Sequence, residues 1–262
     1  MLKRICRFLA GAMRKDQMPD QFSDLPLFAG LSAAQLDEVR QGMVRLSLAP
    51  AEPLFLQGDP ADRFFVLLEG RLKVTQVTED GQQFIVRIVH PGELCGFAPA
   101  LGRSHYPGSA EAMVECRLLA WPRSRWEPLI GAAPSLAFSA IQAVGRKLDE
   151  AHTRLREMST EEAGRRIAHL LLRLLRDSAG AKEGAGAKEG AGGKDGDRRK
   201  GGTAEIPFPL TRQDIADMSG NTLHTASRIM AAWESDGILA RARRKVIIAD
   251  MAALEAIARP QS

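Results

Sequence analysis

Four glycines recur every 11 or 12 residues through the segment 44–121, and this spacing most constrains how the chain can fold. They are Gly58, Gly70, Gly81 and Gly92. Short apolar runs separate them, and the run RLKVTQV alternates with the period of two that is typical of a strand. The Asp-Gly pair in EDGQQ is a signal for a hairpin turn. Short strands with regular glycine turns predict an all-β barrel or sandwich.

Helical periodicity replaces strand alternation on both sides of this segment. Residues 32–43 predict a short helix with Ser32 as its N-cap. Residues 135–158 carry apolar residues at alternating spacings of 3 and 4, which is a heptad seam. A second copy of the same helix in a two-fold dimer would bury this seam; an intramolecular core helix is the alternative. The predicted dimer seam consists of Ile141, Val144, Leu148, Ala151, Leu155 and Met158.

A further helix is predicted over 159–176, with an acidic, capped start and basic residues near its end. Residues 179–196 then repeat a six-residue unit three times, as AGAKEG, AGAKEG and AGGKDG. Glycine and paired opposite charges leave nothing to bury, so a flexible insert is expected over 178–204.

The C-terminal third contains the most informative stretch, LTRQDIADMSGNTLHTASRIMAAWESDGIL. Thr211 can cap a first helix, Gly220 fits a turn that needs positive φ, and Thr222 can cap a second helix. Two short helices around a glycine turn predict a helix-turn-helix. The segments ILARA, RR and KVIIAD follow and predict a two-stranded wing with a basic tip, which would attract DNA phosphates. The consecutive order of these elements predicts DNA binding more specifically than the helix-turn-helix alone.

Composition narrows the class of protein. Three widely spaced cysteines predict no disulfide framework and a cytoplasmic location. No membrane span is predicted, because no run of about 18 apolar residues occurs. The first 22 residues are typical of a short leader rather than a signal peptide. An enzyme is not expected, because the sequence lacks a P-loop, Gly-x-Ser-x-Gly, His-Glu-x-x-His and a metal-spaced cysteine set.

These segments together resemble the family of the cyclic-AMP receptor protein and the fumarate-nitrate reductase regulator (Crp/Fnr). PLFAGLSAAQLDEV resembles its opening helix, GDPADRFFVLLEGRLKV and HPGELCGF its β-roll, and LTRQDIADMSG the first helix of its DNA-binding domain. The resemblance spans nearly all of residues 25–255 apart from the insert. It implies an α+β fold: a cyclic-nucleotide-binding-like β-roll over 23–133, a dimerisation helix over 134–158 and a winged helix-turn-helix over 159–258.

The resemblance also implies which residues contact double-stranded DNA. His224, Ser227 and Arg228 match base-reading positions, and the guanidinium fork of Arg228 suits guanine O6 and N7. His224 stands where many relatives carry glutamate, so the base it contacts stays open. Paired recognition helices about 34 Å apart predict an inverted-repeat operator. Phosphate contacts are expected from Thr211, Arg212, Gln213, Thr222, Arg243, Arg244 and Lys245.

The sensor domain departs from the cyclic-AMP binders. Phe97 and Pro107-Gly108 stand where those proteins carry a glutamate for the ribose and an Arg-Ser pair for the phosphate, so cyclic AMP is not expected. An iron–sulfur cluster needs about four thiolates and is not expected either. The segments NTLHTASRIMAAWESDGI and SHYPGSAEAM most resemble the nitric-oxide-responsive branch (NnrR and DNR type), some of whose members are thought to bind haem.

An effector pocket is therefore expected between the β-roll and the dimer helix. Its predicted lining is Leu94, Cys95, Phe97, Leu101, His105 and Tyr106. Haem is a candidate cofactor, and its candidate ligands are His90, His105 and His152.

The predicted function is that of an effector-controlled homodimeric transcription regulator. A small molecule or gas, with nitric oxide as the favoured candidate, would bind one dimer arrangement better than another and re-aim the recognition helices. RNA polymerase is the expected partner. The alternatives are a regulator with another small-molecule effector and an effector-independent DNA-binding protein.

Overall fold

A computed structural model describes most of the chain outside the first 25 residues. The chain divides into two compact units, the first drawn mainly from 1–74 and 88–142 and the second from 75–87, 143–183 and 187–262. The described residues are 26–28, 30–81, 83–98, 102–132, 137–138, 141, 144–145, 148–149, 152, 162–183, 203–242 and 244–259. The predicted leader therefore lies outside them.

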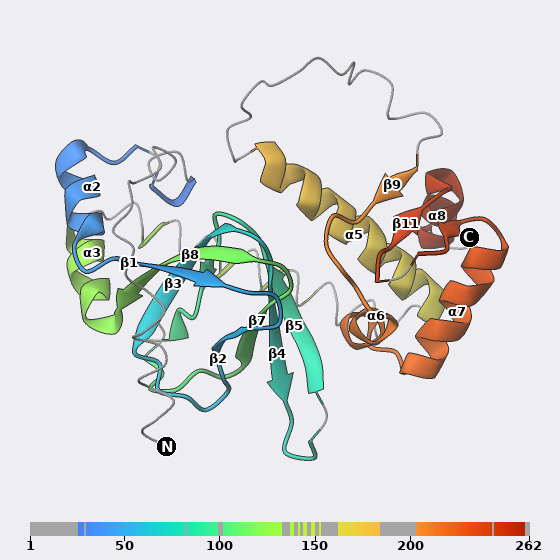
Figure 1. The fold of residues 1–262 in the computed structure, drawn as a ribbon, viewed down its shortest axis with the longest axis horizontal. Helices are drawn as coiled ribbons and strands as arrows, with labels where there is room; N and C mark the ends of the chain where they lie inside the picture. Colours follow the sequence, from blue (N-terminus) through green and yellow to red (C-terminus); the bar gives the residue numbers. More distant parts are fainter. Residues whose placement is uncertain are drawn as a thin grey trace. The chain divides into compact units, whose positions relative to one another are not determined.

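Two four-stranded sheets form a β-roll, as the family resemblance implied, in the segment that the glycine spacing predicted to be all-β (Figure 1). One sheet has the strand order β1-β8-β3-β6, and the other has the order β2-β7-β4-β5. Strand β3 pairs antiparallel with both β8 and β6, and β1 pairs antiparallel with β8. The strands are β1 Val44–Leu48, β2 Pro53–Phe55, β3 Arg63–Glu69, β4 Leu72–Val77, β5 Gln83–Val89, β6 Leu94–Cys95, β7 Ser109–Ala112 and β8 Cys116–Pro122.

The four recurring glycines all have positive φ, between 83° and 94°. Gly70 also has no room for a side chain. A Cβ there would lie 2.4 Å from the carbonyl oxygen of Glu115 and 2.6 Å from Sγ of Cys116. The backbone conformation and the close approach both require glycine at this turn.

The sheet containing β3 is buried on both faces. Phe65 and Leu67 point into a core shared with the other sheet, whereas Phe64 and Val66 point into a second apolar cluster. Strand geometry explains this, because consecutive side chains point to opposite faces. The second cluster is covered by three short helical elements: η2 Pro26–Phe28, α2 Ala33–Arg40 and α3 Trp126–Ala132.

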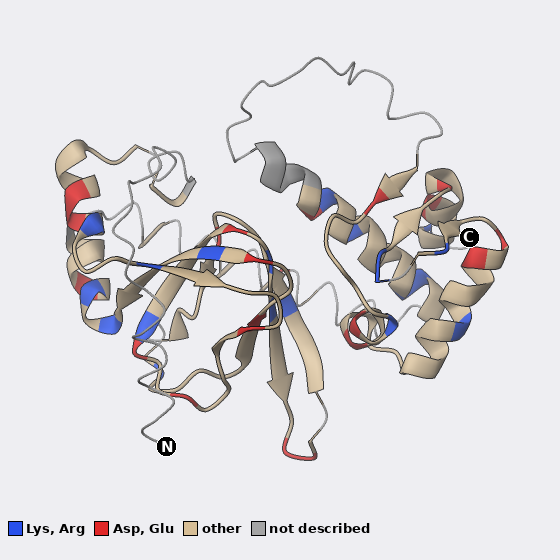
Figure 2. Ribbon diagram, viewed as in Figure 1, with Lys and Arg blue, Asp and Glu red and all other residues tan. Residues whose placement is uncertain are grey.

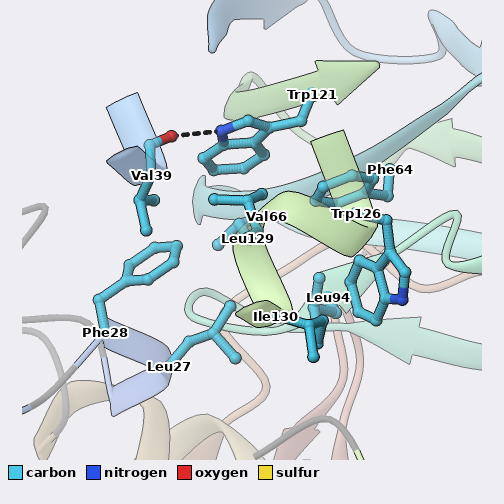
Figure 3. Close-up of a pocket in the computed structure, with 10 residues that line it drawn as sticks. All are labelled: Leu27, Phe28, Val39, Phe64, Val66, Leu94, Trp121, Trp126, Leu129 and Ile130. Carbon is cyan, nitrogen blue, oxygen red and sulfur yellow. Dashed lines mark hydrogen bonds between the residues drawn. The ribbon is translucent and has the colours of Figure 1, made fainter. Parts of the chain in front are cut away.

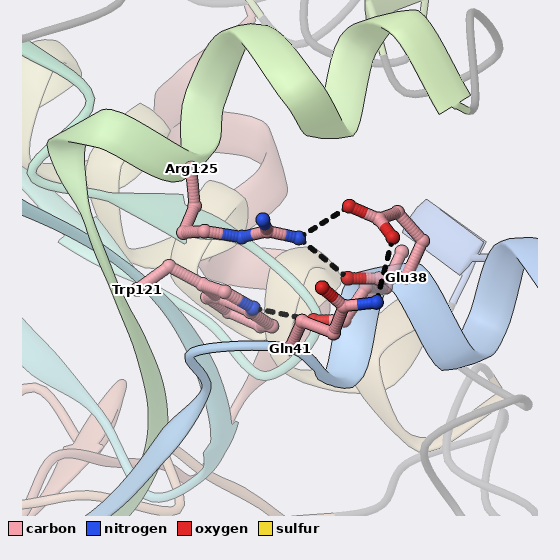
Figure 4. Close-up of polar contacts among 5 residues, drawn as sticks. Glu38, Gln41, Trp121 and Arg125 are labelled. Carbon is pink, nitrogen blue, oxygen red and sulfur yellow. Dashed lines mark hydrogen bonds and ion pairs between the residues drawn. The ribbon is translucent and has the colours of Figure 1, made fainter.

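Helix α2 begins at the predicted cap, since the side chain of Ser32 accepts from a backbone N–H. Hydrogen bonds then attach α2 to strand β8 and to the turn that follows it (Figure 4). The indole N–H of Trp121 donates to the carbonyl oxygen of Val39 at 2.6 Å. Arg125 donates to the carbonyl oxygen of Glu38 at 3.1 Å and forms an ion pair with its carboxylate. Buried carbonyls at the end of α2 are therefore satisfied by side chains of distant residues.

Replacing Trp121 with phenylalanine should keep much of the buried ring and remove one hydrogen bond. The carbonyl of Val39 would lose its buried donor, so we expect the free energy of unfolding of the β-roll to fall by about 1–3 kcal/mol. Chemical denaturation followed by circular dichroism measures the change. Trp126→Phe is the matched control, because the half-buried Trp126 contacts Phe64 through its ring. A loss for Trp121→Phe no larger than for the control would contradict the prediction.

The second unit contains four helices and a small antiparallel sheet of order β10-β11-β9 among its described residues. Strands β10 and β11 are the predicted wing, whereas β9 is a third strand that the sequence did not predict. Helix α5 buries the apolar residues of its inner face, which are Ile167, Leu170, Leu171 and Leu174. The elements are α5 Ala163–Glu183, β9 Ala204–Glu205, α6 Arg212–Ser219, α7 Leu223–Ser235, β10 Leu239–Ala240, β11 Ile247–Ile248 and α8 Met251–Ala258.

The boundaries of the predicted flexible insert 178–204 are wrong at both ends. Helix α5 continues into it as far as Glu183, and β9 occupies its last position. Ser178 is buried and donates to the carbonyl oxygen of Leu174 at 2.7 Å, and the alanine, lysine and glutamate that follow favour helix. Residues 184–202 lie outside the described part of the chain.

Candidate DNA-binding site

Three local signals set the two helices of the helix-turn-helix, and the sequence predicted all three. The hydroxyl of Thr211 accepts from the N–H of Asp214 at 3.0 Å, and the Asp214 carboxylate accepts from the N–H of Thr211 at 2.9 Å, which caps α6. Gly220 has φ 64° and ψ 36°, so it ends α6 in the left-handed conformation. Thr222 caps α7 by accepting from the N–H of Thr225 at 3.1 Å.

A residue of α5 holds the turn between α6 and α7. Arg166 donates to the carbonyl oxygen of Ser219 at 3.1 Å and to Oδ1 of Asn221 at 2.6 Å. The side-chain amide of Asn221 donates to the hydroxyl of Ser219 at 2.9 Å. Arg166 could not be predicted from the sequence, because its contacts span 53 and 55 residues and no local pattern marks them. The turn that aims α7 is therefore fixed by α5 as well as by its own glycine.

The first turns of α7 expose the predicted base-reading side chains. His224 and Arg228 are exposed and Ser227 is half-buried, and a spacing of three and four residues places them on one helix face. Among the described residues, the side chains of His224 and Arg228 have no hydrogen-bond or ion-pair partner. The opposite face of α7 packs into the domain core through Ala226, Met230 and Trp233.

The predicted phosphate contact of Arg212 implies a guanidinium that is free to bind DNA, but in the structure this group is hydrogen-bonded within the domain. Its guanidinium donates to both carboxylate oxygens of Glu234, at 3.0 and 3.1 Å, and to the carbonyl oxygen of Ser227 at 3.3 Å. Most of its donors are therefore used inside the domain, between α6 and α7. The neighbouring Gln213 is exposed, and its side-chain amide donates to Asp217 at 2.6 Å.

The wing presents basic side chains at the loop between β10 and β11 (Figure 2). Arg241 and Arg244 are exposed, and Lys245 pairs with Glu205 of β9 at 2.7 Å. Arg243 lies outside the described residues. The predicted basic tip is thus present beside a helix-turn-helix whose outer face is polar and uncovered.

Comparisons with known proteins match both parts of the chain. Residues 45–132 match the model of the cyclic nucleotide-binding domain, and residues 165–257 match that of the Crp-like helix-turn-helix domain. The chain is a DNA-binding transcription regulator of the Crp/Fnr type. A regulator of this type is not an enzyme, in agreement with the sequence analysis.

Relatives of this Crp/Fnr-type regulator cover almost its whole length. It is 27% identical over 233 residues to the cyclic AMP receptor protein of Thermus thermophilus, covering 89% of this chain and 96% of the relative. It is also 27% identical over 231 residues to the nitrogen fixation regulation protein FixK of Bradyrhizobium diazoefficiens, covering 88% of each. The solved structure of FixK2 from Bradyrhizobium japonicum superposes with a TM-score of 0.65 at 20% identity, covering 84% of this chain and 99% of that one. This likeness confirms the predicted α+β fold.

The regulator exposes an apolar row in the region of the predicted dimer seam. Ile141, Val144 and Leu148 are helical, with exposed fractions of 67%, 41% and 55%. Phe138, which the predicted seam omitted, is helical and 65% exposed. The other predicted seam positions, Ala151, Leu155 and Met158, lie outside the described residues.

The structure corrects the predicted effector pocket, because its described members do not pack in one cluster. Leu94 packs in the outer apolar cluster, whereas its neighbour Cys95 packs in the core between the sheets. Alternation along a strand separates them, which the prediction overlooked. Tyr106 is also a core residue: its ring stacks on Phe55 at 4.0 Å, and its hydroxyl donates to the carbonyl oxygen of Arg63 at 2.7 Å. Burial raises the pKa of Tyr106 far above its ordinary value.

The remaining members of the predicted pocket are also dispersed. Phe97 is half-buried against the outer cluster, and Leu101 lies outside the described residues. His105 is exposed, and its Nδ1 is hydrogen-bonded to the hydroxyl of Ser104 at 2.9 Å.

None of the candidate haem ligands lines the apolar pocket that the structure describes in the first unit. His105 and His152 are exposed, and His90 is half-buried at the end of β5. No group of three or more His, Cys, Asp or Glu side chains suited to a metal ion occurs among the described residues.

An apolar pocket does exist in the first unit, at a place the sequence analysis did not consider. It lies between the β1-β8-β3-β6 sheet and the helices that cover it (Figure 3). Leu94 is its only member from the predicted effector pocket, and no histidine lines it. Its lining is Leu27, Phe28, Val39, Phe64, Val66, Leu94, Trp121, Trp126, Leu129 and Ile130.

Within the described residues, no helix is both long and apolar enough to span a membrane.

Proposed function

We propose that this protein acts as a homodimer that reads an inverted-repeat operator in double-stranded DNA through the outer face of α7. The observation that carries the proposal is the pair His224 and Arg228 on the first turns of α7. Both side chains are exposed and have no partner among the described residues, and the helix is capped and buried on its other side. Arg228 would form the two hydrogen bonds that its guanidinium fork makes with guanine. Ser227 lies on the same face, and its hydroxyl would supply a further polar contact from a shorter side chain.

Phosphate contacts would position this face on the duplex without reading sequence. Thr211 and Thr222 are exposed at the starts of α6 and α7, where helix N-termini attract anions. We assign further phosphate contacts to the exposed Gln213, Arg244 and Lys245 and to Arg243. Arg212 is left out of this set, because its guanidinium is held by Glu234.

The dimer would form through the exposed apolar row Phe138, Ile141, Val144 and Leu148. Four large apolar side chains that are exposed on helical residues at spacings of three and four are typical of a helix that pairs with another helix. Two-fold pairing would place two α7 helices about one turn of DNA apart, which explains why an inverted repeat is expected.

Selection of binding sites from randomised duplexes tests this function. Full-length protein should enrich an inverted repeat whose half-sites are about 10 base pairs apart, centre to centre. Lengthening the spacer by about five base pairs turns the half-sites to opposite faces of the duplex and should abolish tight binding. Enrichment of no sequence, or of a single half-site that tolerates every spacer, would contradict the proposal.

We further propose effector control with nitric oxide as the effector, and with RNA polymerase as the partner at the promoter. The support is the resemblance of residues 104–113 and 221–238 to the nitric-oxide-responsive branch. Operator affinity measured with and without a nitric oxide donor should differ, since an effector acts only through unequal affinity for two states. Equal affinities would favour another effector or effector-independent binding. Cyclic AMP serves as the control ligand and should leave the affinity unchanged.

A further inference from the structure

A single carboxylate holds two arginines beside the recognition helix. Glu234 lies in the last turn of α7, and its side chain is only 13% exposed. Its two oxygens accept from Nη2 of Arg212 at 3.0 and 3.1 Å, and Oε2 lies 3.8 Å from Nε of Arg241. Arg212 is the first residue of α6, and Arg241 directly follows β10 at the base of the wing. Glu234 therefore joins the elements that precede and follow α7.

The contacts of Arg212 run along the length of α7. Besides Glu234, its guanidinium donates to the carbonyl oxygen of Ser227, seven residues earlier and thus about two helical turns away. Arg212 is 39% exposed and Arg241 is 90% exposed, so DNA could reach both groups if Glu234 released them. Both lie next to the helix that carries the base-reading residues.

We propose that Glu234 keeps these two guanidinium groups from neutralising DNA phosphates and thereby limits the affinity of the protein for DNA of any sequence. The inference rests on the proposed function of α7 in reading DNA. A cation that contacts phosphate adds affinity for every sequence alike, because phosphates carry no sequence information. Holding Arg212 and Arg241 on an internal carboxylate lowers binding to unrelated DNA and leaves the contacts of Arg228 unchanged. The same factor applies to operator and to unrelated DNA, so Glu234 lowers the overall affinity for DNA and makes it less sensitive to salt.

Glu234→Gln in the full-length protein tests this inference through the salt dependence of binding. Each phosphate newly neutralised steepens the plot of log affinity against log salt by about 0.9, so we expect a steepening of about 0.9 to 1.8 on a scrambled duplex. Between 50 and 200 mM salt, this amounts to an extra loss of affinity of roughly 3- to 12-fold. The ratio of operator to scrambled affinity should stay unchanged, because the added phosphate contacts act on both duplexes alike. Fluorescence anisotropy with labelled duplexes measures both quantities.

Glu255→Gln is the matched control. It removes the same charge from an exposed position on α8 that holds no arginine in the described structure, and its salt slope should equal that of the wild type. Arg241→Gln provides a second test that does not depend on the folding of Glu234→Gln. In the wild-type background it should leave the slope on scrambled duplex unchanged, because Arg241 does not engage phosphate while Glu234 is present.

The outcomes separate this inference from the proposed function. If the wild type selects an operator but its salt slope matches that of Glu234→Gln, this inference alone is overturned. A slope for Arg241→Gln that is shallower than the wild type by about 0.9 would also overturn it. Wild-type protein that distinguishes no duplex from another would overturn the proposed function, and this inference with it.

Discussion

Arg228→Ala is expected to reduce discrimination between operator and scrambled duplex by roughly 5- to 150-fold. The range corresponds to the loss of a bidentate arginine–guanine contact, which is worth about 1–3 kcal/mol. The side chain is exposed and has no partner within the described structure, so its removal should leave folding unchanged. Binding isotherms on both duplexes at one salt concentration give the ratio, and circular dichroism checks the fold.

Two further variants determine what kind of contact Arg228 makes. Arg228→Lys keeps the charge and loses the planar fork, so it should retain affinity for scrambled duplex while discrimination stays low. Arg176→Ala is the matched control, because it removes an exposed cation from α5 in the same unit. If Arg228→Lys discriminates as well as the wild type, the contact is to phosphate and the base-reading assignment is wrong.

Placing aspartates at Ile141 and Leu148 together is expected to convert the protein to a monomer and to weaken operator binding by about 100-fold or more. Both side chains are more than half exposed in the single chain, so the charges cost little there, but they would be buried without partners in a helix pair. A monomer binds one half-site at a time and loses the gain of linked binding, which is about 10²- to 10⁴-fold. Analytical ultracentrifugation and anisotropy measure the two effects.

Asp149→Asn is the control for this pair of substitutions. Asp149 is also helical and exposed, but it is polar and lies outside the apolar row. The control should remain dimeric with wild-type affinity. A double variant that still sediments as a dimer, or a monomer that binds the operator as tightly as the wild type, would refute the proposed role of the row.

Features encoded by neighbouring residues were predictable. The caps Thr211 and Thr222 and the left-handed Gly220 each follow from the residue type at that position and from its near neighbours, so the helix-turn-helix could be placed from sequence. The glycine turns of the β-roll are equally local, since each needs only a residue that tolerates positive φ.

Features that depend on distant contacts were not predictable. The pairing of Arg212 with Glu234, 22 residues later, depends on how two helices pack, and an outward position on α6 gave no hint of it. The effector pocket failed for a related reason. Leu94 and Cys95 form a two-residue strand, which is too short for an alternating pattern to show that the two side chains face different cores.

The double-sided burial of the β1-β8-β3-β6 sheet has a consequence for which parts of the β-roll can move. Strands β3 and β8 lie inside this sheet with apolar residues packed on both faces, so their amide hydrogens should be among the last in the protein to exchange with deuterium. A sheet that is packed on both faces resists bending, so any rearrangement is expected at its edges. The sheet then serves as the fixed frame, and the short helices and hairpins around it are the parts free to respond.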